Sequence, residues 1–210
     1  MKKNHLLFAV AGLLLTTETI CATVVQVHLP EPYFLGFRPG DIIVTRHYFD
    51  LDGDQIDDLS FGSTAVGLTA ATFASNGIIH VPSPPPDMGG DAAPLWLGAL
   101  IGADPSLIVP GLIWKEGGSR MIICMDSGCA GLWHNESAYL GVRFERSDGT
   151  HYGYMHFIAD DDNSKGWITG WAWETEPNKA IAAGAIPEPG GGALLCSVAA
   201  LVIRHRTRRQ

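Results

Sequence analysis

The feature that most limits the fold is the density of glycine and proline, with 25 Gly and 13 Pro in 210 residues. Both residues destabilise helix interiors and favour turns. Between them lie short apolar runs rich in Val, Ile, Tyr, Phe and Trp, which are typical of strands. The strands are predicted at residues 24–29, 42–49, 59–64, 77–81, 107–114, 121–125, 139–145, 151–158 and 167–173. No stretch has a helical period, so we expect an all-β fold, an antiparallel β-sandwich or jelly roll.

The overall composition excludes two classes of protein. Hydrophobic residues make up 46 % of the chain and charged residues 17 %, which is far too apolar for a disordered polyampholyte. The formal net charge is −8, whereas a nucleic-acid binder needs a basic face for the phosphates. We therefore expect a folded domain without a nucleic-acid partner.

The first 22 residues have the three parts of a secretory signal peptide. Lys2 and Lys3 precede an apolar run over residues 6–15, and small Ala22 follows. This order predicts export and cleavage after Ala22. A short anchor helix is the weaker alternative, because the apolar run is well below the roughly 20 residues that span a bilayer.

The last 24 residues predict a membrane anchor. A proline-rich break precedes the apolar run 193–203 and a cluster of arginines, an arrangement that stops transfer with the arginines in the cytoplasm. The segment resembles the PEP-CTERM sorting tail of exported bacterial proteins. The resemblance implies that an exosortase-type membrane peptidase recognises the motif and removes the tail, so that the anchor is transient. The residues concerned are Pro187, Glu188, Pro189, Arg204, Arg206, Arg208 and Arg209. The tail is short for a bilayer, since residues 190–203 make about 21 Å of helix against about 30 Å of hydrocarbon. The alternative is a hydrophobic, basic tail that lies on the membrane surface.

These boundaries divide the chain into a signal peptide (1–22), an ectodomain (23–186) and a sorting tail (187–210). Residues 23–189 carry eight Lys and Arg against 21 Asp and Glu, a formal charge of −13. So acidic a body repels anionic surfaces and attracts divalent cations. Residues 139–189 also resemble the ectodomains of PEP-CTERM proteins, which implies a location and an architecture but no reaction.

An acidic loop at residues 50–58 predicts a calcium site. Oxygen ligands at alternate positions can surround a hard cation, and the expected set is the carboxylates of Asp50, Asp52, Asp54 and Asp58 with the carbonyl of Ile56. The loop resembles those of FG-GAP repeats, in which Gly usually stands where this chain has Gln55. We expect a structural Ca²⁺ here, and the alternative is a solvated acidic turn.

Two further groups of residues carry predictions. Cys124 and Cys129 are six residues apart inclusive, which suits a small disulfide loop in an oxidising compartment. Trp167, Trp171 and Trp173 have mostly even spacing, so their rings would share one sheet face and could stack on sugar rings. The alternative is that they belong to the sandwich core.

No residue pattern specifies a catalytic centre. Ser127 lacks the Gly-x-Ser-x-Gly context of a nucleophile elbow. Glu136, Glu145, Glu174 and Glu176 could supply a glycosidase pair, but one sequence does not bring any two to the required separation. We therefore expect a non-enzymatic envelope or matrix protein associated with extracellular polysaccharide. The alternatives are a secreted polysaccharide hydrolase, a carbohydrate-binding module, or a purely structural stalk.

Overall fold

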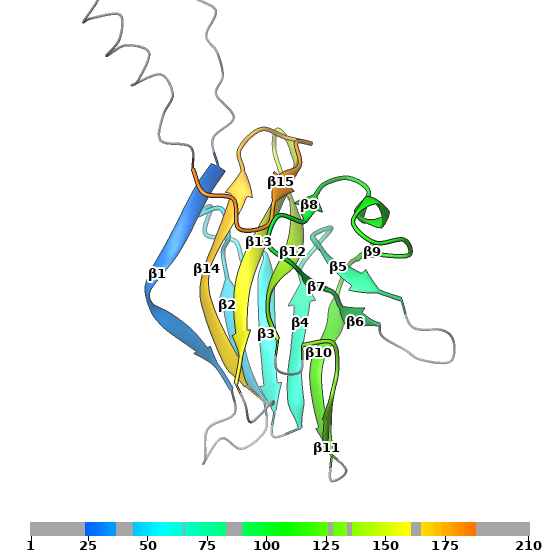
Figure 1. Ribbon diagram of the computed structural model, residues 1–210. Helices are drawn as coiled ribbons and strands as arrows, with labels where there is room; N and C mark the ends of the chain where they lie inside the picture. Colours follow the sequence, from blue (N-terminus) through cyan, green and yellow to red (C-terminus); the bar gives the residue numbers. More distant parts are fainter. Residues whose placement is uncertain are drawn as a thin grey trace, which may run out of the picture.

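The computed structural model describes residues 24–36, 44–64, 66–82, 90–125, 128–133, 136–160 and 165–187 (Figure 1). In this part of the chain nearly all regular structure is β, and no helix is long and apolar enough to cross a membrane. The predicted signal peptide lies outside the described residues. So does the sorting tail, including Glu188, Pro189 and the four arginines, with the exception of the exposed Pro187.

One large sheet dominates the fold. Its strands, in spatial order, are β1 (Val24–Leu35), β14 (Gly166–Glu174), β13 (Gly149–Ala159), β12 (Ser137–Arg146), β5 (Gly77–Val81), β6 (Asp91–Ala92), β10 (Gly118–Met125), β4 (Gly67–Thr72), β3 (Leu59–Thr64) and β2 (Thr45–Phe49). Three short strands branch from this path: β7 (Pro94–Leu95) pairs with β12, β9 (Ile113–Lys115) with β5, and β11 (Gly128–Ala130) with β10. A separate pair is formed by β8 (Leu100–Ile101) and β15 (Ile181–Ala182), and η1 (Pro105–Leu107) is a single 3₁₀ turn. The described pairings are antiparallel apart from that of β6 with β10.

The two ends of the sheet meet across a shared core. Phe49 of β2 lies with its ring centroid 5.4 Å from that of Tyr33 in β1 and 6.0 Å from that of Trp171 in β14. The buried cluster that joins these ends draws on β1 to β5, β10 and β12 to β14. The sheet is therefore folded over, and in Figure 1 the yellow and orange strands β13 and β14 pass in front of the cyan strands β2 and β3. This folding buries one face of each half, so the apolar residues that alternate along the strands are removed from water.

The half of the sheet around β13 is covered on its other face as well. A second buried cluster contains Tyr152 and Tyr154 of β13 together with Leu95, Ile101 and Ile181 from the loops and short strands. This double cover explains why five successive residues, His151 to Met155, are all buried in β13. A strand covered on both faces loses the polar alternation that marks a half-exposed strand.

Most of the predicted strands are confirmed, and residues 59–64 and 77–81 match their elements at both ends. The strand predicted at residues 107–114 is wrong except for its last two residues. Asp104 instead caps the 3₁₀ turn by accepting from the Ser106 backbone N–H at 2.9 Å, and Gly111 has a φ of 93°. Strand β4 was not predicted, because Gly, Ala and Thr dominate its sequence and large apolar residues do not mark it.

Candidate metal centre

The acidic loop joins β2 to β3, as the sequence predicts. Phe49 and Leu59 are paired across the two strands, and the Asp58 backbone N–H donates to the Phe49 carbonyl at 2.9 Å. Residues 50–58 thus form a closed loop at one end of a hairpin. The strands fix the ends of the loop, and the carboxylates between them are brought close together.

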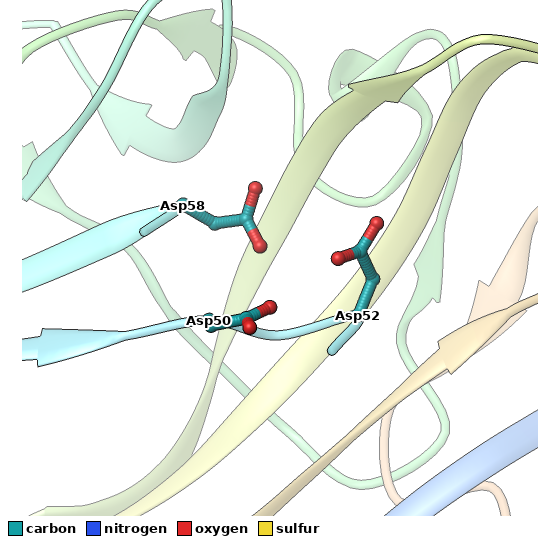
Figure 2. Close-up of side chains that lie close together, drawn as sticks. All are labelled: Asp50, Asp52 and Asp58. Carbon is teal, nitrogen blue, oxygen red and sulfur yellow. The ribbon is translucent and has the colours of Figure 1, made fainter. Parts of the chain in front are cut away.

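Three of the four predicted carboxylates form one group. Oxygen atoms of Asp50, Asp52 and Asp58 all lie within 4.8 Å of one another, and Figure 2 shows the side chains of Asp52 and Asp58 turned toward each other. The Asp54 carboxylate is not part of this group, and its Oδ1 accepts from the Ile56 backbone N–H at 2.7 Å. Ile56, whose carbonyl belongs to the predicted ligand set, is 66 % exposed.

The loop is shaped by its own carboxylates. Asp50 accepts from the backbone N–H groups of Gly53 and Gln55, each at 2.7 Å, and Asp52 accepts from that of Asp54 at 3.1 Å. Gly53 has a φ of 82°, where glycine has no steric cost, but Gln55 has a φ of 72° and does. The left-handed backbone at residue 55 therefore costs about 1 kcal/mol for Gln.

Asp58 is the most constrained carboxylate of the group. It is only 8 % exposed, and burial raises its pKa to about 6, with the charges of Asp52 and Asp54 adding to the effect. Hydrogen bonds from the Leu51 backbone (2.9 Å) and the Asn76 side chain (2.8 Å) oppose this rise. A buried carboxylate beside two others gains from a cation that neutralises them.

Two residues from distant parts of the chain complete the site, and sequence analysis missed both. Asn76 donates to Asp58 and accepts from the Glu145 backbone N–H at 3.1 Å, which ties the loop to β12. Arg146 places its Nε 3.3 Å from Asp52 Oδ2, and its guanidinium carbon lies 4.8 Å from the ring centroid of Trp173. Burial is the largest cause that raises the pKa of Asp52, and Arg146 lowers it. The β3–β4 hairpin places Asn76 beside Asp58, where the Phe73 backbone N–H donates to the Asp58 carbonyl at 3.2 Å. The pairing of β12 with β5 brings Arg146 to the loop, and no local signal predicts that pairing.

The three tryptophans do not share a face, which corrects the expectation from their spacing. The register between β13 and β14 shifts around Thr169, so the alternation of side chains is interrupted there. Trp171 and Trp173 pack on the inner core, where Trp171 Nε1 donates to the Leu51 carbonyl at 3.0 Å and Trp173 is 5 % exposed. Trp167 follows the opposite alternation and packs against Phe34, with 5.9 Å between ring centroids. A sugar ring cannot reach Trp173, so its role is in the core.

The predicted disulfide falls on a hairpin. Cys124 and Cys129 are Cα partners in the antiparallel pair of β10 and β11. Opposed residues in such pairs lie about 4.5 to 5.5 Å apart at Cα, within the range that disulfides span. The backbone register thus permits the bond that the spacing predicts.

The candidate acids of an enzyme are engaged in local interactions. Glu174 is buried and accepts from the Glu176 backbone N–H at 3.1 Å, and Lys179 bridges the two with Nζ 3.5 and 3.3 Å from their carboxylates. Glu145 Oε1 accepts from the Thr150 hydroxyl at 2.7 Å. These contacts lie at the turn between β12 and β13 and at the end of β14.

An uncharged cavity of about 230 Å³ lies on the outer face of β1, β14 and β13. Its lining includes His28, Tyr139, His156, Thr169 and Trp171, of which Trp171 is one of the predicted stacking residues. His156 Nδ1 lies 2.6 Å from the Thr169 hydroxyl oxygen. The volume is below the roughly 300 to 1,000 Å³ of sites for drug-sized ligands.

Comparison with known proteins finds no significant similarity, because neither a family model nor a curated protein nor a solved structure matches the chain.

Proposed function

We propose that this chain is an exported envelope or extracellular-matrix protein with a β-sandwich body, held at the membrane by its C-terminal tail and sorted by an exosortase-type peptidase. Its role is non-enzymatic, and it associates with extracellular polysaccharide. The observation that carries the proposal is where the packing of the body ends. Among the described residues, Ala185 is the last one held by a hydrogen bond, which its carbonyl accepts from the Tyr154 hydroxyl. Ile186 and Pro187 are exposed, and Pro187 is the first residue of the sorting motif.

The body binds a structural Ca²⁺ in the β2–β3 loop. The group of Asp50, Asp52 and Asp58 offers only oxygen ligands, which suit a hard cation. The ion would balance the charge of three neighbouring carboxylates that a single Arg146 offsets only in part. This role is one of stability, because the loop ends a hairpin of the main core.

The sorting proposal is tested by following the protein in cells with and without an exosortase. The expected result is a smaller, released form that appears only when the peptidase is present. A triple variant of Pro187, Glu188 and Pro189 to alanine should remain in the membrane fraction at its full mass. Release of the triple variant at the same mass as the wild type would contradict the proposal.

A second candidate function, carbohydrate binding, is favoured by the uncharged cavity on the outer face. We propose neutral sugar units of the polysaccharide as its ligand, because aromatic and hydroxyl groups line it without a charged side chain. His28→Ala at the exposed rim should weaken binding of the polysaccharide in calorimetry. Tyr48→Ala, at another exposed position, on β2, is the control that should leave binding unchanged. Equal binding by both variants would exclude this cavity, and release of reducing ends by the wild type would favour the hydrolase alternative.

A further inference from the structure

An apolar patch is exposed beside the point where the described chain ends. It consists of Trp96, Leu97, Leu100 and Leu107, of which Leu107 is 84 % and Trp96 55 % exposed. Trp96, Leu100 and Leu107 line one cavity of about 360 Å³. Asp104 also lines this cavity, and it is the only charged residue in the sequence between Asp91 and Lys115. On a body with a charge of −13, a surface so depleted of charge marks an interaction site.

The patch is hydrogen-bonded to the C-terminal segment of the described chain, residues 181–187. Leu100 pairs with Ala182 in the small sheet of β8 and β15, and Ala99 and Ala183 share a backbone hydrogen bond of 2.8 Å. The Gly98 backbone N–H also donates to Ala183 at 2.8 Å. In Figure 1, β8, β15 and η1 lie in the upper part of the molecule, and the coloured ribbon of the C-terminal segment also stops at this end, on the side of β1. Backbone pairing therefore joins the patch to the C-terminal segment.

The tail limits how far this end of the body can stand from a bilayer. From Pro187 to Ala193, where the apolar run begins, there are six peptide steps, which reach at most about 20 Å when fully extended. The polar layer on each side of a bilayer is itself several ångströms thick. A body held on so short a tether presents to the lipid headgroups the end from which the C-terminal segment leaves. Tryptophan beside leucine is the composition that prefers this interface.

We propose that the apolar patch rests on the lipid surface while the tail anchors the chain. The inference rests on the proposed function, because it requires the tail to enter the membrane. Removal of the tail leaves the patch without an anchor in the bilayer, so the released body detaches more readily.

The experiment uses the chain from Thr23 to Gln210 in nanodiscs whose lipids carry bromine on the acyl chains near the headgroups. Bromine quenches tryptophan fluorescence on contact. We expect quenching of the wild type, and loss of most of that quenching in Trp96→Phe. Trp167→Phe is the matched control that keeps it, because β14 begins at the opposite end of the molecule (Figure 1). Leu107→Asp, at a highly exposed position, should also reduce the quenching without disturbing the core.

Equal quenching of wild type and Trp96→Phe on nanodiscs that carry the protein would overturn the inference while leaving the sorting proposal intact. Failure of the wild type to associate with nanodiscs would contradict the prediction that the C-terminal tail is a membrane anchor. If Trp96→Phe leaves the quenching unchanged but alters the oligomeric mass, the patch is an interface between copies of the chain and the inference is wrong.

Discussion

Replacing Asp58 by Asn should have opposite effects at two pH values when calcium is absent. The folded protein holds the Asp58 proton more tightly than the unfolded chain, since the pKa rises from 3.8 to about 6. The native state therefore loses stability as the pH rises through 6, by about 3 kcal/mol for a shift of about two units. Asn carries no charge and avoids this loss. It cannot accept the Leu51 N–H with its amino group, which costs about 1 kcal/mol.

With calcium chelated, Asp58→Asn should thus be about 1 kcal/mol less stable than the wild type at pH 4 and about 2 kcal/mol more stable at pH 7. The gain at pH 7 corresponds to a rise in melting temperature of roughly 4 to 8 °C for a protein of this size. Urea denaturation followed by tryptophan fluorescence measures both differences. Asp57→Asn is the matched control, because it removes the same charge from an exposed neighbour outside the carboxylate group.

Calcium should reverse the order at pH 7. An ion that binds only the native wild type at 100 times its dissociation constant adds about 2.7 kcal/mol, and Asp58→Asn should gain far less. A variant that is less stable than the wild type at both pH values would refute the electrostatic reasoning. A variant that gains as much from calcium as the wild type would show that Asp58 is not a ligand.

Three other changes test separate parts of the structure. Gln55→Gly should stabilise the chain by about 0.5 to 1 kcal/mol in urea denaturation, because φ is 72° there, and a loss of stability would show that the Gln side chain contributes more than the strain costs. Replacing Cys124 and Cys129 by Ser should lower stability by about 2 kcal/mol under oxidising conditions and leave it unchanged under reduction, whereas free thiols in the oxidised wild type would exclude the bond. Trp173→Ala should cost about 3 to 5 kcal/mol, measured by melting, since the ring is buried in the main core. Loss of polysaccharide binding at an unchanged melting temperature would restore a role for this residue in stacking.

The sequence predicted what local chemistry determines. The strands at residues 59–64 and 77–81 and the hairpin of β12 and β13 carry their own signals in β-branched and aromatic residues and in Asp148-Gly149. The hairpin closes with Arg146 opposite Gly149, so that Gly149 is the first paired residue of β13, with a φ of 136°. Asp50, Asp52 and Asp58 were found because alternate oxygen ligands within one loop need no information from elsewhere.

The rest depends on contacts between distant residues. Arg146 reaches the acidic loop through the pairing of β12 with β5. Asn76 reaches it through β4, which the sequence does not mark as a strand, and the face of Trp167 depends on a register shift that spacing does not reveal. The segment at residues 107–114 is apolar for two other reasons. Leu107 belongs to the exposed patch, and Leu112 packs in the cluster that covers β13. Neither use requires the segment to be a strand. Apolar composition alone does not distinguish these uses.

The most direct test of the central claim is the intact mass of the mature protein released from its own cells. A chain that starts at Thr23 and ends near Pro187, short by both terminal segments, is the result that we predict. A released protein that still carries Arg208 and Arg209 would contradict removal of the tail and with it the sorting account.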